Sequence, residues 1–416
     1  KDEQDNSLST FIFGGISKDE DGDQSPLIIN DSISSEVPKT ELRDGVKINS
    51  ATGTAADKAK YDLEFLQAGT EFPLSFELPI DKHDDKDRLV KALAIALSGL
   101  ENHEISLGMK KRRGFGRCHV KEWQVWNFNL EDEDASDRNL WLNFEHWRTG
   151  FIPIFNVHTS ITEALGINLD IKKEDKRDRF LIHATFQLVG SLLIRSGQDS
   201  TGRAPDVVHL KSNRNNELKP VLSGTSLAGV LRHRAERIVN TLEKPTKIID
   251  DVFGPDFSED KTKKAKASRL IVHEKEIEIE KDAELVQTRI AIDRFTGGAY
   301  HGALFDEQPI FGDKHTYVNI ELELRKPDKL EIGLLLLLLK DLWTQDLPVG
   351  GESSIGRGRL KGIKADLIRH HPQNPKQWQI TESKGNLQIE DKWDSSKSET
   401  LVKYELEQFV KALLKE

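Results

Sequence analysis

The stretch Asp293-Arg294-Phe295-Thr296-Gly297-Gly298-Ala299-Tyr300 decides the fold of this chain, because a version of it occurs twice. Residues 49–56, with the sequence Asn49-Ser50-Ala51-Thr52-Gly53-Thr54-Ala55-Ala56, match it at an offset of 244 positions. The similarity continues at the same offset, where Tyr61-Asp62 corresponds to Phe305-Asp306. Segments related in this way indicate that a longer unit is repeated.

Two further pairs of segments repeat at nearly the same spacing. Arg113-Gly114-Phe115-Gly116-Arg117 corresponds to Ile355-Gly356-Arg357-Gly358-Arg359 at an offset of 242 positions. Ser25-Pro26-Leu27-Ile28-Ile29-Asn30 corresponds to Ser268-Arg269-Leu270-Ile271-Val272-His273 at an offset of 243 positions. Three anchors with nearly one offset indicate a tandem duplication, and so long a period predicts two domains rather than a solenoid.

The two copies differ at their beginnings. In the second copy, residues 180–250 precede Asp251-Val252-Phe253-Gly254. The corresponding segment of the first copy, Phe11-Ile12-Phe13-Gly14, lies close to Lys1. We therefore expect the first copy to lack its front part and to be the remainder of a longer polypeptide.

Composition sets broad limits on the function. The 416 residues carry a net charge of −10 and a single cysteine, Cys118. The charge argues against non-specific coating of nucleic acid, although it says little about local patches, and one cysteine excludes a disulfide framework and a cysteine-built zinc site. The longest apolar run, residues 334–339, is too short to cross a bilayer, and no signal peptide is visible. We expect a soluble, cytoplasmic protein without a membrane partner.

The pattern of apolar residues predicts an α+β chain. In the second copy, periods of two and of 3.6 residues alternate in a β-α-β-β-α-β order, which is typical of the ferredoxin-like unit. The expected strands are residues 180–188, 270–272, 317–324 and 359–367, and the expected helices are residues 226–242 and 329–343. The first copy repeats the later half, as a strand at 72–78, a helix at 86–99 and a strand at 117–125.

We accordingly predict two tandem ferredoxin-like (RRM-like) domains. Residues 1–125 form the first domain, of which only the C-terminal part is expected, and residues 126–178 form a linker that packs on a neighbour through Trp141, Phe144 and Trp147. Residues 179–370 form the complete second domain. Residues 371–416 are expected to be a tail that ends in an amphipathic helix at 399–415.

Both copies place a glycine-rich loop between a helix and a strand. Glycines allow backbone N–H groups to approach a phosphate, and the interleaved cations supply charge. A tight turn at a sheet edge would explain two glycines, but it would explain neither the cations nor the repetition. We predict phosphate contacts from Lys110, Lys111, Arg112, Arg113, Gly114, Phe115, Gly116 and Arg117 in the first loop, and from Gly351, Ser353, Ser354, Gly356, Arg357 and Arg359 in the second.

A hydroxyl-rich turn leads into the helix at 226–242. The free amides and the positive dipole end of such a helix suit an anion. Thr225 and Ser226 lie at its start, and Arg232 and Arg234 could extend the same surface. An ordinary capped helix with exposed charges is the alternative interpretation.

The order of these motifs resembles the RAMP superfamily. A strand and a polar loop precede Gly224-Thr225-Ser226-Leu227-Ala228-Gly229-Val230-Leu231-Arg232, and then come Phe253-Gly254, the repeated stretch at 293–299 and a glycine-rich loop. More narrowly, the chain resembles the backbone subunit of type III CRISPR effector complexes, and its two units are similar to the fused backbone proteins of the type III-D and III-E variants. The resemblance covers residues 180–367 as one full unit and residues 11–125 as a unit without its front.

The resemblance implies a set of RNA contacts. In that family, the glycine-rich loops and the helix after the hydroxyl-rich turn hold the guide RNA, and a β-hairpin thumb wedges into the guide–target duplex at a regular interval. Arg294, Phe295 and Thr296 would form the tip of the second thumb, and residues 49–56 would be their equivalent in the first copy. An apolar wedge can unstack a base step while an arginine holds the backbone. A hairpin that lies on its own domain is the alternative.

The resemblance also implies cleavage of target RNA by an aspartate in the loop after the first strand, with a divalent Mg or Mn ion. The loop at 196–210 contains two candidates, Asp206 and Asp199, and we favour Asp206 as catalytic residue and metal ligand because an apolar pair follows it. His209 and Arg203 are candidate helpers, or else RNA contacts or solvated residues. The loop is longer than is common in the family, and the turn lacks the family's lysine, which leaves an inactive second copy open.

We therefore predict a subunit that binds CRISPR guide RNA and complementary target RNA beside other subunits of a type III effector complex, and that acts as a metal-dependent endoribonuclease. A non-catalytic subunit that only binds guide RNA is one alternative. A guide-processing endonuclease is another, which the absence of a convincing histidine–lysine set makes weaker.

Overall fold

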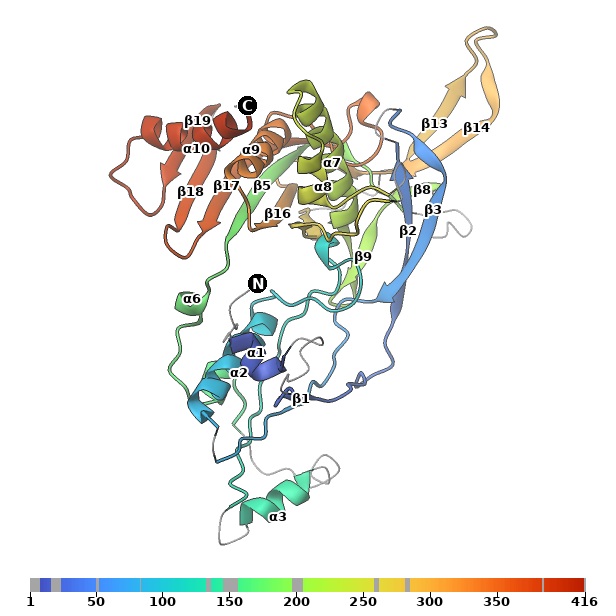
Figure 1. Cartoon of the computed structure of the whole chain (residues 1–416). Helices are drawn as coiled ribbons and strands as arrows, with labels where there is room; N and C mark the ends of the chain where they lie inside the picture. Colours follow the sequence, from blue (N-terminus) through green and yellow to red (C-terminus); the bar gives the residue numbers. More distant parts are fainter. Residues whose placement is uncertain are drawn as a thin grey trace. The chain divides into compact units, whose positions relative to one another are not determined.

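The computed structural model describes ten stretches of the chain, which are drawn with their elements in Figure 1. They are residues 8–15, 24–49, 52–82, 84–131, 136–144, 156–196, 205–257, 262–280, 285–383 and 385–414. The chain divides into two compact units. The first comprises Lys1–Ile33, Phe72–Gly108 and Gly116–Asp175, and the second comprises Ser34–Glu71, Met109–Phe115 and Lys176–Glu416. The units therefore cut across the boundaries of the sequence repeat.

The second unit is built on one large sheet with the strand order β19-β18-β17-β5-β16-β12-β10-β9, in which β11 also pairs with β16. Its strands are β5 (Arg179–Val189), β9 (Lys211–Arg214), β10 (Glu217–Leu222), β11 (Leu270–Val272), β12 (Lys275–Glu278), β16 (Tyr317–Arg325), β17 (Arg359–His370), β18 (Lys376–Ser383) and β19 (Asn386–Asp391).

The central strand is β5, which pairs antiparallel with β17 over its whole length and with β16 over residues 179–187. Its burial alternates, so that Phe180, Ile182 and Phe186 are buried while their neighbours are less so. These side chains share one core with the apolar faces of α7 (Gly224–Thr241), α8 (Lys247–Phe253) and α9 (Lys329–Trp343). This alternation explains why β5 was predicted within a few residues of its position. The two longer helices, α7 and α9, were predicted as closely from their helical period.

The helix α9 is apolar nearly all round because a second helix covers it. Asp328 and Glu331 form a capping box that begins α9 and satisfies two free amides. The helix α10 (Glu399–Leu414) packs against it, and a Cβ at Gly333 would lie only 2.2 Å from the backbone oxygen of Phe409. Gly333 therefore permits the close approach of α10.

The C-terminal segment belongs to the core of the second unit. The helix expected at 399–415 is present as α10, but the preceding residues form β18 and β19, which extend the large sheet beyond β17 (Figure 1). Trp378 of β18 is among the most buried large side chains. We expected a tail here, because the strand pattern at 376–391 went unrecognised.

The first unit is organised around α2 (Lys86–Glu101), which packs with α1 (Leu8–Phe13) and α5 (Ile161–Ala164). The segment expected to be a linker therefore contributes to this unit, through the buried Ile161. It also contains α3 (Ser136–Leu142) and α6 (Ile171–Glu174). Trp141 of α3 is exposed, Phe144 contacts Trp126 and Phe128, and Trp147 lies outside the described residues.

Two strands predicted for the first copy are barely formed. The strand expected at 72–78 is reduced to β4 (Phe76–Glu77), which pairs with β1 (Ile28–Ile29), and residues 117–125 make only isolated pairings at Arg117 and Trp123. Their equivalents in the second copy, β16 and β17, both pair with β5. No strand among the described residues of the first unit corresponds to β5, and a strand is stable only when its backbone groups are paired.

The duplication is visible in local contacts. Ser25 donates its hydroxyl to the backbone oxygens of Ile12 and Leu27, both at 3.0 Å. Ser268 donates in the same way to Val252 at 3.0 Å and to Leu270 at 2.7 Å.

Within the described residues, no helix combines the length and apolarity that a membrane crossing requires.

Lys397 ties the C-terminal segment together. Its ammonium group lies 2.8 Å from Asp391 at the end of β19 and 2.8 Å from Glu405 on α10. Burial opposes charge on both carboxylates, but the hydrogen bonds from Lys397 hold the pKa of Asp391 and of Glu405 below their ordinary values. Asp391 and Glu405 in turn raise the pKa of Lys397 above its ordinary range.

We predict that Lys397→Met lowers the free energy of unfolding by about 1–3 kcal/mol at neutral pH, because it leaves Asp391 poorly compensated. Carboxylates with depressed pKa values stabilise the fold above the ordinary carboxylate range, and this stability is lost as the pH falls through their folded pKa values. The difference between variant and parent should therefore shrink in acid. Urea denaturation at several pH values measures it.

The matched control is Lys392→Met, which breaks an ion pair of half-exposed side chains with Glu390. It should change the free energy of unfolding by less than about 1 kcal/mol. An equal effect of the two substitutions, or an effect of Lys397→Met that does not depend on pH, would contradict the prediction.

Candidate nucleic-acid interface

Two long β-hairpins carry the repeated stretch of sequence. The first joins β2 (Thr40–Ile48) to β3 (Ala55–Leu66), and the second joins β13 (Gln287–Ile292) to β14 (Ala299–Gln308). Both contain a register shift just before the tip, and both close on an alanine, since Ile48 pairs with Ala55 and Ile292 with Ala299. The two hairpins are therefore the same structure, repeated.

The tip of the second hairpin is organised by Asp293. Its carboxylate accepts the backbone N–H groups of Phe295 and Thr296, both at 2.8 Å, and the hydroxyl of Thr296 at 3.1 Å. The hydrogen bonds from Thr296 and Phe295 hold the pKa of Asp293 below its ordinary value. The turn is thus ordered by its own side chains.

This ordered turn presents an exposed apolar side chain. Phe295 is 99% exposed, and Arg294 and Thr296 beside it are exposed as well. Ile292 and Tyr300 next to the tip are also exposed large side chains. An apolar side chain on a rigid turn suits insertion between stacked bases. In the first hairpin, the counterparts of Arg294 and Phe295 lie outside the described residues.

The two glycine-rich loops have the same backbone. Lys110 and Glu352 both adopt the left-handed conformation, at φ 52° and 59°, and each precedes a short 3-10 turn, η1 (Lys111–Arg113) or η2 (Ser353–Ile355). Gly114 and Gly356 end these turns, at φ 86° and 92°. The loops therefore repeat in conformation as well as in sequence.

Each loop is closed by a glycine that no other residue could replace. The backbone oxygen of Gly116 accepts a hydrogen bond from Leu107 at 2.8 Å, and that of Gly358 accepts one from Val349 at 2.9 Å. A Cβ would lie 1.7 Å from the oxygen of Leu107 at Gly116, and 1.9 Å from that of Val349 at Gly358. Both glycines also have positive φ values, which disfavour any side chain.

The start of the first loop packs against the second copy within the second compact unit. A Cβ at Gly224, the first residue of α7, would lie 2.3 Å from the backbone oxygen of Arg113, and a Cβ at Gly114 would lie 2.4 Å from the amide nitrogen of Glu274. Arg113 donates to the backbone oxygen of Phe253 at 3.3 Å. Burial, aided by the charge of Arg232, lowers the pKa of Arg113.

The other cations of the first loop differ in their surroundings. Lys110 donates to the hydroxyl of Tyr61 at 2.8 Å and stacks on its ring. Arg112 is half-buried, and burial, followed by the charge of Arg325, lowers its pKa. Lys111 is exposed, as is Arg117 beyond the loop's closing glycine. The first loop thus keeps cations at its surface.

The second loop exposes serines rather than arginines. Ser353, Ser354 and Gly356 are exposed, and Gly351 is partly so, whereas Arg357 is only 3% exposed. Arg359 donates to the backbone oxygen of Gln345. The contacts to RNA predicted for these two arginines stay predictions. The polar side chains that the loop exposes are the hydroxyls of Ser353 and Ser354, beside the exposed Ile355.

Arg357 belongs to a cluster of charges at the base of the second hairpin. It lies 3.0 Å from Glu307 of β14, which is fully buried, and 3.2 Å from Glu352. Arg289 of β13 and Arg195 of β7 (Arg195–Ser196) complete the cluster, at 3.0 Å from Glu307 and 2.9 Å from Glu352. The cluster joins the hairpin, the glycine-rich loop and the start of the candidate catalytic loop.

The buried glutamate of this cluster is electrostatically unusual. Burial, followed by a hydrogen bond with Glu352 and its charge, raises the pKa of Glu307, against the pull of Arg357 and Arg289. This carboxylate lies near arginines of β13, of the glycine-rich loop and of β7. A buried charge must keep such partners, so Glu307 restricts the movement of these three elements relative to one another. Sequence reasoning did not identify this residue.

The helix α7 begins at Gly224, two residues before the predicted start, and its cap is Ser223. The hydroxyl of Ser223 accepts the N–H of Ser226 at 3.3 Å, and Thr225 and Ser226 are half-buried. Arg232 donates to the backbone oxygen of Gly254 at 2.7 Å, and Arg234 lies 2.7 Å from Asp341 of α9. Both arginines are thus engaged within the protein, and their contact with RNA stays a prediction.

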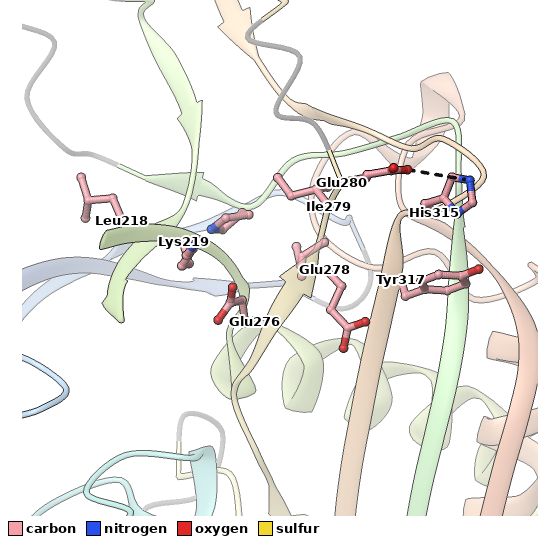
Figure 2. Close-up of a pocket in the computed structure, with 10 residues that line it drawn as sticks. Leu218, Lys219, Glu276, Glu278, Ile279, Glu280, His315 and Tyr317 are labelled. Atoms are coloured by element: carbon pink, nitrogen blue, oxygen red, sulfur yellow. Dashed lines mark ion pairs between the residues drawn. The ribbon is translucent and has the colours of Figure 1, made fainter. Parts of the chain in front are cut away.

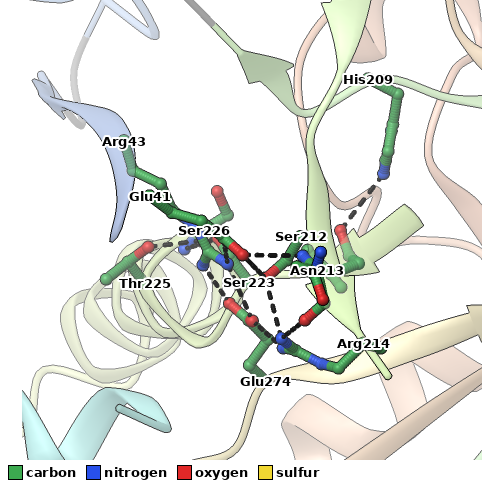
Figure 3. A network of polar contacts seen from close by, with 11 residues as sticks. Glu41, Arg43, His209, Ser212, Asn213, Arg214, Ser223, Thr225, Ser226 and Glu274 are labelled. Carbon is green, nitrogen blue, oxygen red and sulfur yellow. Dashed lines mark hydrogen bonds and ion pairs between the residues drawn. The ribbon is translucent and has the colours of Figure 1, made fainter. Parts of the chain in front are cut away.

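A second buried network ties the first hairpin to the second copy (Figure 3). Arg43 of β2 forms a two-point ion pair with Glu274, which also lies 2.5 Å from Arg214 of β9. Glu41 accepts the hydroxyl of Ser212 at 2.9 Å and the N–H of Asn213 at 2.7 Å. All of these residues belong to the second compact unit.

Aromatic rings enclose the guanidinium of Arg43. It lies 4.7 Å from the ring centre of Phe65 on β3 and 5.6 Å from that of Phe115, which is half-buried at the end of the first glycine-rich loop. Glu41 and Arg43 are 7% and 8% exposed. Their spacing of two on a strand places them on one face, which is the signal by which the sequence could have identified the network.

Asp206 lies at the base of the second hairpin. It is exposed, it directly precedes β8 (Val207–His209), and its carboxylate accepts the N–H of Asp306 on β14 at 2.9 Å. The strands β8 and β14 pair in parallel immediately beyond this contact. The competing candidate, Asp199, lies outside the described residues, as does Arg203.

His209 is a core residue rather than a helper of catalysis. It is 1% exposed, with Nε2 at 3.2 Å from the backbone oxygen of Val221 and Nδ1 at 3.2 Å from that of Leu192. Our expectation of a helper, an RNA contact or a solvated residue is wrong, because the side chain satisfies backbone groups in the interior.

The surroundings of Asp206 offer oxygen ligands to a divalent cation. The carboxylate of Asp206 is exposed, and one carboxylate oxygen of Asp306, whose backbone N–H bonds to Asp206, is buried and has no hydrogen-bond partner in the described structure. Mg²⁺ and Mn²⁺ favour such oxygen ligands and commonly use one or two carboxylates together with substrate phosphates. No group of three or more ligating side chains gathers anywhere among the described residues.

The geometry defines a two-copy protein of mixed α/β structure, whose repeated hairpins and glycine-rich loops present the same features twice. The model of the RAMP superfamily matches residues 1–119 and 185–361, which together exceed half of the chain. The chain therefore belongs to the RAMP superfamily, and one match in each copy confirms the tandem arrangement. Membership supports a CRISPR-associated, RNA-binding subunit. None of the curated proteins matches the chain significantly.

We predict that Glu274→Gln lowers the free energy of unfolding of the second unit by about 3–5 kcal/mol, because it leaves Arg43 and Arg214 with too little compensating charge in a buried network. Hydrogen exchange should also become faster in β2 and β3. Urea denaturation and amide exchange measure the two effects.

Asp256→Asn serves as the control, since Asp256 pairs with Lys47 of the same hairpin where both side chains are exposed. It should cost less than about 1 kcal/mol. If Glu274→Gln costs no more than the control, the network does not hold the hairpin.

Proposed function

We propose that this chain is a backbone subunit of a type III CRISPR ribonucleoprotein, which holds the guide RNA and cleaves complementary target RNA. One observation carries the proposal: in a RAMP chain, an exposed hairpin and a glycine-rich loop each occur twice with the same backbone. A repeated binding unit suits a polymer with a repeated backbone, as RNA is.

The order of the elements in the second copy supports a ferredoxin-like fold for this domain. Six of its elements occur along the chain in the order β5, α7, β11, β16, α9 and β17, with shorter elements between some of them. The four strands lie in the order β17-β5-β16-β11, and each neighbour is antiparallel. This is the order that a β-α-β-β-α-β unit produces, and it leaves the hairpin β13–β14 as an insertion between β11 and β16.

Three features of the chain would contact RNA. The exposed cation Lys111 and the hydroxyls of Ser353 and Ser354 suit phosphates. The apolar tip at Phe295 would unstack a base step of the guide–target duplex, with Arg294 on the adjacent backbone. Both hairpins belong to one compact unit, so the chain would hold RNA at two points of the same body.

We predict that Phe295→Ala weakens binding of a guide–target duplex by the assembled complex about tenfold, since stacking of one base on an aromatic side chain contributes ~1–3 kcal/mol. Trp393→Ala is the control, because Trp393 is an exposed aromatic residue of the C-terminal segment. Equal losses in the two variants would remove the hairpin tip from the RNA site. Fluorescence anisotropy with labelled RNA measures both.

For cleavage, we propose that Asp206, at the base of the second hairpin, acts on the target strand. The 2′-hydroxyl of the target attacks the adjacent phosphorus in line; a bond from O2′ to phosphorus forms, the bond to O5′ breaks, and the products are a 2′,3′-cyclic phosphate and a 5′-hydroxyl. Asp206 would accept the proton of the 2′-hydroxyl or would hold Mg²⁺ or Mn²⁺, and the departing O5′ would take up a proton from water. Such an ion would neutralise charge that develops on the phosphate.

A non-catalytic subunit that binds guide RNA is the second candidate. The observation in its favour is that the carboxylate of Asp206 accepts from a backbone N–H, while the described residues gather no set of three ligands around it. A carboxylate occupied by the backbone of its own protein could serve only to order the loop.

We predict that Asp206→Asn in the assembled complex lowers target cleavage at one or more positions by at least ~100-fold, the lower range for loss of a general acid or base, and leaves RNA binding unchanged. Gel analysis of cleavage products, with Mg²⁺ supplied and with it withheld, measures the effect. Asp199→Asn is the comparison variant, and the complex that contains it should cleave the target as the parent complex does.

Loss of a product in Asp199→Asn alone would transfer the role to Asp199. Unchanged cleavage in both variants and in the double variant would favour the non-catalytic subunit.

A further inference from the structure

Two neighbouring strands of the large sheet separate and leave a hollow between them. β10 and β12 pair only at Val221–Glu276 and Leu222–Lys275. Beyond these pairs a hollow of about 690 Å³ opens, with Leu218, Lys219 and Pro220 of β10 on one side and residues 276–280 on the other (Figure 2). His315 and Tyr317, at the start of β16, complete the lining.

Pro220 explains why the ladder stops. Val221 donates its N–H to Leu210 at 3.1 Å, toward β9. Successive residues of a strand direct their backbone groups to opposite edges, so the nitrogen of Pro220 faces β12. Proline has no N–H to donate, and the next rung of the ladder between β10 and β12 is therefore missing its donor.

Each strand is already paired on its other side. Residues 217–220 of β10 pair with β9, and in β12 Ile277 pairs with Val318 and Glu278 with Tyr317 of β16. Within the described chain, these parts of β10 and β12 have no strand partner on the sides that face the hollow. Free strand edges of this kind accept an additional strand.

The charges of the lining favour one kind of strand. Glu276, Glu278 and Glu280 are exposed, while Ile277 and Ile279 between them turn inward. Glu278 accepts from Asn319 at 2.6 Å, and Glu280 lies 3.8 Å from His315.

On the facing side, Lys219 is paired with Glu217 at 2.5 Å. The lining is therefore acidic, which repels phosphate. The hollow thus differs from the RNA-contacting surfaces proposed above, and it suits a protein segment with positive side chains.

We propose that this hollow receives an extended segment of a partner protein by strand addition, with lysine or arginine at alternate positions that face Glu278 and Glu280 and approach Glu276 at the closed end of the hollow. Alternate residues of an added strand lie on one face, two positions apart like the glutamates. The exposed side chain of Leu218 at the rim would cover the stem of one basic residue. The proposal does not depend on RNA binding or cleavage.

The probe is a short synthetic peptide that alternates lysine and valine, with blocked ends, titrated against the full chain. We expect binding that weakens about tenfold in the double variant Glu276→Gln/Glu280→Gln, since exposed cross-strand charge pairs contribute only modestly each. Glu278 is left in place because it bonds to Asn319. Glu390→Gln on the edge strand β19 is the matched control and should bind as the parent does.

Two further peptides separate strand addition from simple charge attraction. A version with N-methylated amides keeps its charges but cannot form a ladder, and we expect its binding to be lost. A version with glutamate in place of lysine should also fail to bind.

Equal binding of the N-methylated peptide would overturn the proposal, and so would equal binding by the double variant. Displacement of the peptide by an oligouridylate that binds the parent, but not the double variant, would assign the hollow to RNA instead and overturn it too.

Discussion

The buried ion pair between Arg43 and Glu274 is the interaction on which the rest of the structure depends. It joins a strand of the first hairpin to the segment between β11 and β12, and a guanidinium that is 8% exposed between two phenylalanine rings must be compensated. Arg214 and Glu41 balance the remaining charges. Because of this network, the first hairpin belongs to the same compact unit as the second, and two similar tips share one body.

The same physics decides how the glycine-rich loops present charge. Arg357 looks like a phosphate ligand in the sequence, but burial beside Glu307 and Glu352 commits it to the protein. Arg113 is half-buried against Phe253. Among the polar side chains between Gly108 and Gly116 and between Gly350 and Gly358, those that are exposed are Lys111 on one loop and the serines on the other. The first loop would thus attract phosphate by charge, and the second by hydrogen bonding, although their backbones are the same.

Much of the fold could be predicted from the sequence because its signals are local. The alternation at 180–188 and the helical period at 226–242 and 329–343 correspond to β5, α7 and α9. The prediction failed where a partner strand decides the outcome. Residues 117–125 occupy the position of β17 in the repeat, yet they form no comparable strand, because the described residues of their unit contain no equivalent of β5 for them to pair with.

The sequence by itself determined the duplication, the conformation of the hairpin tip and the shape of the glycine-rich loops. These depend on neighbours in the chain, such as Asp293 with Thr296, or on a glycine that must adopt positive φ, such as Gly358. Only the tertiary structure decided which charged groups remain free for a ligand. Arg43 and Glu274 are 231 positions apart, and Arg357 and Glu307 are 50 apart. A buried charge must be paired, and its partner here is a residue that folding brings close. A local pattern such as the spacing of Glu41 and Arg43 can indicate a shared face, but it does not show which distant residue will be the partner.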